Sequence, residues 1–371
     1  MKIVDQAFKS QSHSGRSGTR LQRRTGGRTG CAWSETRGSI QSVNVQQPIP
    51  SCESQAAPGH RRFDKKSVGW FLLVTFGITW GVEGVLLARG VSFKRIPPIL
   101  FQYAVAALMW APTIGAVFTR KVIRRESLRV PEARLRLGVL APYAVVMVVM
   151  PILFALVYGL TVLLGLGHLD LSLKTFLAQI ETVAGHSLGP QPPARLVIAG
   201  IVLGSVIVAP FINSVFAFGE EYGWRGFLLP QLLPIGRWPA HLIGGVIWGL
   251  WHAPLVLMGF NYPGFPWAGV VWMCALTTLL GIFESEWTLR FNSVLLASFI
   301  HGTFNSQVYG IWRVIVPDAH PLLGGFGGLI GLGVLAVLAT LAWRHRVTLV
   351  QARCDSSADD RTNSLGPGEL H

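Results

Sequence analysis

The chain has 371 residues, of which 50% are hydrophobic and only 13% are charged, and its formal net charge is +14. Soluble domains average about 25% charged residues, so this composition excludes an ordinary soluble protein. Several apolar runs reach the ~20 residues that a helix needs to cross a bilayer. The sequence therefore predicts an all-α fold, a polytopic transmembrane helical bundle with about eight spans.

Residues 1–66 form a basic segment rich in Ser, Gly, Gln and Arg, without apolar periodicity. This composition predicts a disordered tail. A basic tail can bind nucleic acid, but next to membrane spans positive charge more commonly fixes topology and contacts anionic lipid. We therefore expect membrane lipid as a partner, and no nucleic acid. The four cysteines are scattered without a close pair, which argues against a C-x-x-C metal site and a disulfide framework.

Residues 67–346 are expected to form the transmembrane domain, and residues 347–371 a polar C-terminal tail. The most basic loop runs from Arg120 to Arg136 and is cytoplasmic by the positive-inside rule. Both termini are then expected in the cytoplasm, and the protein is expected to be a multi-pass protein of the plasma membrane. The expected spans are residues 68–88, 99–118, 139–166, 196–218, 241–258, 267–283, 293–309 and 322–343.

Several acidic residues lie at the ends of these spans. Glu83 is near the end of the first span, where it is either part of a working cavity or a carboxylate at the interface or between helices. Glu284, Glu286 and Arg290 are expected in the cytoplasmic turn between the sixth and seventh spans.

Two adjacent carboxylates, Glu220 and Glu221, end the fourth span, and Arg225 follows one helical turn later. An ionisable group costs at least ~2.5 kcal/mol at the bilayer centre, so such groups are usually paired or functional. Glu221 and Arg225 stand at i and i+4, which predicts an ion pair on one helical face. Glu220 points about 100° away from Glu221. Unequal surroundings are how enzymes give two neighbouring acids different roles.

Two histidines lie in later spans, His252 in the fifth and His301 in the seventh, and Asn305 shares a helical face with His301. If spans four, five and seven meet, these side chains and Glu220 line one hydrated pocket in the cytoplasmic half of the bundle. Trp248, one turn before His252, is expected to be a packing residue.

Such a pocket could hydrolyse a bond in two ways. In one, Glu220 is a general base that takes a proton from water, and the histidines and Asn305 stabilise the oxyanion. In the other, His252, His301 and a carboxylate bind zinc with one position open for water. The sequence leaves both schemes open.

Taken together, these motifs resemble the CPBP family, which comprises type II CAAX prenyl endopeptidases and bacteriocin-processing (Abi) proteins. The family pattern is E-E-x-x-x-R, then F-x-x-x-H, then H-x-x-x-N or D, on successive helices. The first and third motifs match directly, at Glu220 to Arg225 and at His301 to Asn305. In the second motif Trp248 stands where the family usually has Phe. The similar region covers residues 196–310.

The resemblance implies an intramembrane endopeptidase. Its active site would comprise Glu220, His252, His301 and Asn305, with Glu221 and Arg225 as supporting residues. Family members are often labelled metalloproteases, which is compatible with zinc held by His252 and His301, although a metal-free glutamate mechanism has also been argued for the family.

The predicted function is therefore hydrolysis of a peptide bond near the cytoplasmic leaflet. Two rivals remain: a proton-coupled transporter, for which intramembrane Glu and His are also typical, and a non-catalytic immunity or scaffold protein. The substrate would be a peptide or protein, and the sequence leaves open whether it carries a prenylated C-a-a-X tail.

Overall fold

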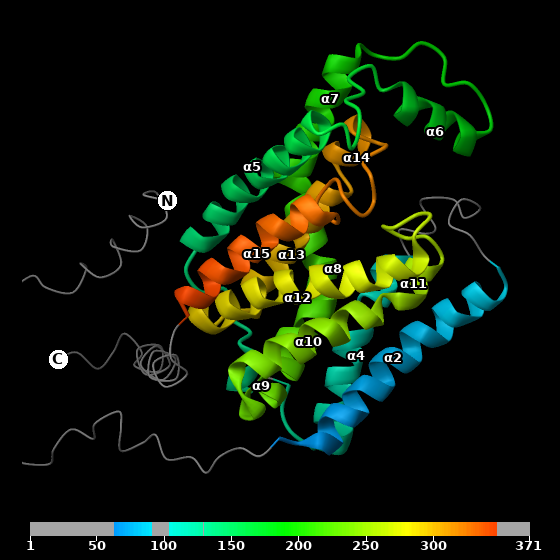
Figure 1. The fold of residues 1–371 in the computed structure, drawn as a ribbon. Helices are drawn as coiled ribbons and strands as arrows, with labels where there is room; N and C mark the ends of the chain where they lie inside the picture. Colours follow the sequence, from blue (N-terminus) through cyan, green and yellow to red (C-terminus); the bar gives the residue numbers. More distant parts are fainter. Residues whose placement is uncertain (1–62, 91–103, 129, 347–371) are drawn as a thin grey trace, which may run out of the picture. The chain divides into compact units, whose positions relative to one another are not determined.

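The structure is a computed structural model that describes residues 63–90, 104–128 and 130–346. Every described residue belongs to one unit, Pro58–His371. The described residues form helices and no strand (Figure 1), which confirms the predicted all-α fold. The predicted tails, 1–66 and 347–371, lie outside the described residues except for residues 63–66.

The helical elements are labelled as in Figure 1, with π and 3-10 turns marked η. They are α2 (Lys65–Ala88), α4 (Ala111–Phe118), η2 (Thr119–Ile123), η3 (Pro131–Ala133), α5 (Ala141–Leu163), α6 (Lys174–Ala184), α7 (Ala194–Leu203), η4 (Gly204–Val208), α8 (Ala209–Gly223), η5 (Trp224–Leu228), α9 (Leu229–Leu232), η6 (Leu233–Ile235), α10 (Arg237–Trp251), α11 (Ala253–Leu257), α12 (Pro266–Phe291), α13 (Val294–Val308), α14 (Ile311–Ile315) and α15 (Leu329–Arg344).

Within the described residues, 4 helices are long and apolar enough to cross a membrane. They are α2, α5, α12 and the continuous helical stretch Ala194–Ile235, and α15 is a shorter apolar helix. Each predicted span overlaps at least one of the described helices. His301 lies in α13, and His252 lies in the turn between α10 and α11, inside the predicted fifth span. The helices α10 and α13 have 15 residues each.

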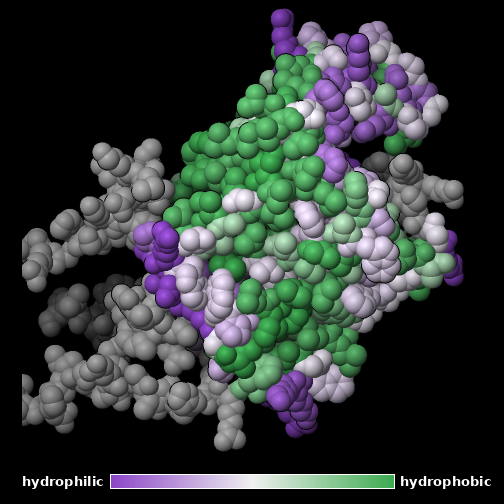
Figure 2. Space-filling model, in the orientation of Figure 1, coloured by the Kyte–Doolittle hydropathy of each residue, from purple (hydrophilic) through white to green (hydrophobic). Residues whose placement is uncertain are grey.

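Apolar side chains dominate the surface of the described helices. In Figure 2 hydrophobic residues cover the middle of the face shown, and hydrophilic residues gather near the helix ends. Large side chains such as Leu163 (80% exposed) and Trp267 (75% exposed) point outward. A contiguous apolar surface of this extent would be unstable in water and is stable in hydrocarbon. The protein is therefore an integral membrane protein.

The first helix begins earlier than the sequence suggested. Asp64 accepts a hydrogen bond from the Ser67 backbone N–H at 3.0 Å and so caps the N-terminus of α2. As a result, Lys65 and Lys66 belong to the helix and not to the basic tail.

The acidic residues after the sixth span are not in a turn, so that prediction is wrong. α12 continues to Phe291, and Glu284 and Glu286 lie inside it, 0% and 2% exposed. The helix ends at Asn292, which adopts a left-handed conformation (φ 50°). Ser293 then caps α13 by accepting from the Leu296 N–H at 3.1 Å. The turn therefore lies beyond the acids, and both carboxylates are carried into the bundle.

Glycines bring α8 and α13 into close contact at the centre of the bundle. A Cβ added at Gly302 of α13 would lie 2.4 Å from the Ser214 backbone nitrogen of α8. Small residues at such positions let helix backbones approach closely in a membrane. This approach carries His301, the neighbour of Gly302, to the C-terminal half of α8, where Glu220 and Glu221 lie.

We expect Gly302→Ala to destabilise the protein by ~1–3 kcal/mol, because the methyl group forces the two backbones apart. The measurement is thermal unfolding of the purified protein in detergent. Gly200→Ala is the control, since a Cβ there meets nothing within 4 Å and Ala is favoured over Gly in a helix. Equal melting temperatures for wild type and Gly302→Ala would contradict the close contact.

Candidate active site

The two adjacent acids are held at the end of α8, where the helix continues into the π-helical turn η5. Glu220 is 2% exposed and Glu221 is 0% exposed. The predicted ion pair is confirmed: Arg225 Nη1 lies 2.9 Å from Glu221 Oε1. The two carboxylates nevertheless have different partners, as their positions on the helix predicted.

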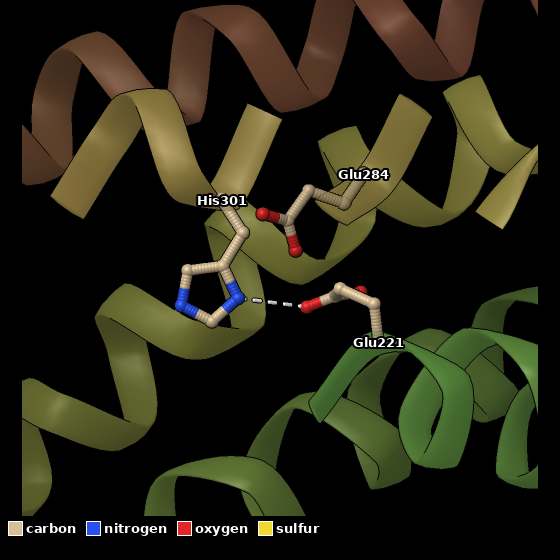
Figure 3. A group of neighbouring side chains, drawn as sticks. All are labelled: Glu221, Glu284 and His301. Atoms are coloured by element: carbon tan, nitrogen blue, oxygen red, sulfur yellow. Dashed lines mark hydrogen bonds and ion pairs between the residues drawn. The ribbon is translucent and has the colours of Figure 1, made fainter. Parts of the chain in front are cut away.

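Glu221 is the centre of an ionic cluster drawn from three helices. Its Oε1 also accepts from His301 Nδ1 on α13 at 2.9 Å, the dashed contact in Figure 3. Glu284 of α12 reaches Arg225 from the other side, with Oε2 at 2.5 Å from Nη2. Figure 3 shows the side chains of Glu221, Glu284 and His301 turned toward one another. One guanidinium therefore serves two buried carboxylates.

Glu220 has tryptophan partners that the sequence analysis did not foresee. Its Oε2 accepts from the Trp248 indole N–H at 2.7 Å and from the Trp224 indole N–H at 3.3 Å. Both tryptophans are buried. Trp248 packs in the buried core, as expected, and its N–H in addition binds the candidate base. The Trp224 contact has a local signal, since Trp224 follows Glu220 by four residues on the same helical face.

Trp248 is also the common neighbour of the two histidines. Its ring centroid lies 5.3 Å from that of His301 and 6.3 Å from that of His252. The structure thus brings Glu220, His252 and His301 together around one indole ring. Asn305 is half-buried one turn farther along α13.

The candidate catalytic side chains keep uncommitted polar atoms. His252 Nδ1 donates to the backbone carbonyl of Trp248, four residues earlier, at 2.9 Å. This leaves His252 Nε2 available. His301 uses Nδ1 for Glu221, and Glu220 uses Oε2 for the tryptophans. Within the described part of the chain, the remaining ring nitrogens, Glu220 Oε1 and the Asn305 amide make no hydrogen bond. These are the atoms available to water and substrate.

The described residues whose side chains have metal-ligand spacing differ from the predicted zinc ligands. In the described ranges, the group whose possible ligand atoms lie within 4.8 Å of one another is Glu221, Glu284 and His301, without His252 or Glu220. In that group Glu221 Oε1 is bonded to both His301 and Arg225. A guanidinium already supplies positive charge to the two carboxylates. The cluster as arranged fits an ionic network better than a metal centre.

Glu83 is a further buried acid. It is 1% exposed on α2, and neither carboxylate oxygen has a hydrogen-bond partner among the described residues. One turn earlier, Thr79 accepts from the Trp251 indole N–H at 2.9 Å. The face of α2 that carries Glu83 therefore contacts the residue next to His252.

A family model confirms the resemblance suggested by the motifs. The model of Rce1-like type II CAAX prenyl endopeptidases matches residues 198–307. This range contains the three motifs and ends two residues beyond Asn305. Residues 198–307 belong to the CPBP family. No curated protein matches the chain.

The CPBP match covers under a third of the chain, from α7 to α13. The family is a protease family, so the match supports a hydrolase. Glu284 lies within the matched range but outside the three motifs. No local spacing could have paired it with Arg225, because the two residues are 59 positions apart in the sequence.

We expect Arg225→Ala to destabilise the protein by about 3–5 kcal/mol, the usual cost of removing one partner of a buried ion pair. The change leaves the Glu221 and Glu284 carboxylates buried without their shared counter-charge. We expect either loss of the folded protein in size-exclusion chromatography or a large decrease in melting temperature. The control is Arg195→Ala on α7, which lies outside the cluster. If both variants have the melting temperature of the wild type, the ionic cluster does not stabilise the bundle.

Proposed function

We propose that the protein is an intramembrane endopeptidase that hydrolyses a peptide bond near the cytoplasmic leaflet. The observation that carries the proposal is the state of Glu220, a buried carboxylate with one oxygen held by two indole N–H groups and the other uncommitted. A carboxylate fixed in this way can accept a proton from water in a defined direction.

In the proposed reaction Glu220 Oε1 takes a proton from a water molecule while the water oxygen attacks the carbonyl carbon of the scissile bond. The carbonyl π electrons move to oxygen, and the Asn305 amide donates a hydrogen bond to the resulting oxyanion. His252 and His301 can add donors through Nε2 when both ring nitrogens carry protons. Collapse of the intermediate breaks the C–N bond, and the proton held by Glu220 passes to the leaving amine.

The supporting residues keep this arrangement rigid. Glu221 fixes the His301 ring through Nδ1, and Arg225 fixes Glu221. Preorganised donors cost no reorganisation at the moment of reaction. Glu221 and Arg225 are therefore proposed to position His301 without reacting themselves.

We further propose about eight spans, with both termini cytoplasmic and the protein in the plasma membrane. The basic segment Arg120–Arg136 supports this orientation through the positive-inside rule. The substrate would be a peptide or protein that reaches the site from the membrane, whether prenylated or not, and membrane lipid would be the other partner.

Glu220→Gln is expected to lower kcat by at least ~10²-fold, because the amide cannot act as a base. The assay is cleavage of membrane peptides by the protein reconstituted in liposomes. Folding should be intact, because the Gln oxygen can still accept from both indoles. Glu181→Gln on α6 is the matched control outside the site.

Wild-type cleavage by Glu220→Gln would end this assignment. Solute uptake by the same liposomes without proteolysis would favour the transporter. An inactive variant that still complements a deletion strain would favour the scaffold.

We propose that the general-base mechanism operates without zinc, since the ligand group with suitable spacing is internally paired through Arg225. Purified active protein should then contain well under one zinc per chain by elemental analysis and keep its activity after dialysis against a chelator. Activity lost on dialysis and restored by stoichiometric zinc would instead support the His252 and His301 metal site. Buffer dialysis without chelator is the control.

A further inference from the structure

Helix α12 contributes two residues to the surroundings of Arg225, and neither belongs to the three motifs. Glu284 is 0% exposed, and its Oε2 lies 2.5 Å from Arg225 Nη2. Gly281 precedes Glu284 by one turn, on the same face of the helix. A Cβ added at Gly281 would lie 3.2 Å from Arg225 Nη2, a tight contact. α12 therefore supplies both a counter-charge and the space into which the guanidinium fits.

Arg225 in turn contacts both halves of the candidate active site. Nη1 binds Glu221, whose Oε1 also holds His301. The guanidinium carbon lies 4.3 Å from the centre of the Trp248 ring, and the Trp248 N–H binds Glu220. A shift of Arg225 would therefore move both the acid that orients His301 and the indole that orients Glu220.

One opposing carboxylate could not fix the guanidinium by itself. Paired with Glu221 alone, Arg225 could still rotate about its own side-chain bonds, because both residues stand on one helix face. A second carboxylate from α12 pulls on the other nitrogen and holds the group between two helices. Buried charges in hydrocarbon are stable only when paired in this way.

We propose that Glu284, seated with Gly281 on α12, is a positioning residue for the reaction: it fixes Arg225 and through it Glu221, His301 and Trp248. This inference rests on the proposed endopeptidase function. Turnover would then depend on three acids, Glu220, Glu221 and Glu284, and Glu284 comes from a helix that carries no motif residue.

The test compares Glu284 with Glu286, two residues along the same helix. Glu286 is equally buried and accepts from Arg237 Nε at 2.8 Å and from His241 at 2.6 Å, neither of which is a candidate catalytic residue. Both Glu→Gln changes remove one buried carboxylate charge from α12. If Glu284 only stabilises the fold, the two variants should behave alike. The measurements are kcat and KM per folded molecule in liposomes, and melting temperature.

We expect Glu284→Gln to lower kcat by ~100-fold, the typical effect of misplacing reacting groups by about 1 Å, with KM changed less than about 3-fold. Glu284→Asp keeps the charge and should recover at least ~10-fold of this loss. Gly281→Ala should also lower kcat, because its methyl group displaces the guanidinium. Glu286→Gln should lower the melting temperature and leave kcat unchanged. Equal kcat for Glu284→Gln and wild type, or equal losses in both Gln variants, would overturn the proposal.

Failure of the proposed endopeptidase function can be distinguished from failure of the positioning role of Glu284. If wild type and Glu220→Gln are both without peptidase activity, the endopeptidase assignment fails, and the positioning role is decided by an experimental structure of Glu284→Gln. Displacement of Arg225 from Glu221 and Trp248 in that structure supports the role. Unchanged contacts of Arg225 with both residues overturn it.

Discussion

One guanidinium between two carboxylates organises the centre of this protein. Arg225 faces Glu221 at 2.9 Å and Glu284 at 2.5 Å, and all three side chains are at most 3% exposed. Three charges removed from water are tolerable only when each lies against an opposite one. The turn η5, the end of α8 and the C-terminal half of α12 must therefore stay together for the bundle to be stable. His301 ties α13 to the same cluster.

The ionic cluster distinguishes side chains that position others from side chains that have a polar atom free for the reaction. Arg225 binds both Glu221 and Glu284, and Glu221 Oε1 also binds His301. By contrast, Glu220, His252 and His301 each keep one polar side-chain atom without a hydrogen bond within the described residues. Preorganisation of this kind needs close helix packing, and the glycine contact between α13 and α8 supplies it. Both the stability of the bundle and the geometry of the candidate active site thus depend on the close packing of α8 and α13.

Two other buried acids differ in whether they are paired. Glu286 follows the same rule, with Arg237 and His241 as partners from α10. Glu83 departs from it, because its carboxylate has no hydrogen-bond partner in the described part of the chain. An unpaired carboxylate is costly in hydrocarbon. Glu83 lies one turn after Thr79, which accepts from the Trp251 indole N–H.

The sequence by itself determined the features that depend on neighbours along one helix. The apolar runs predicted an all-helical membrane protein, and i, i+4 spacing predicted the Glu221–Arg225 ion pair, because such geometry is local. Spacing could not supply Glu284 or the Trp248 N–H as partners, since those contacts join helices far apart in the chain. The end of α12 decided the fate of Glu284: a helix that stops at Asn292 buries an acid that an earlier turn would have left in water. Only helix packing chooses between those two environments.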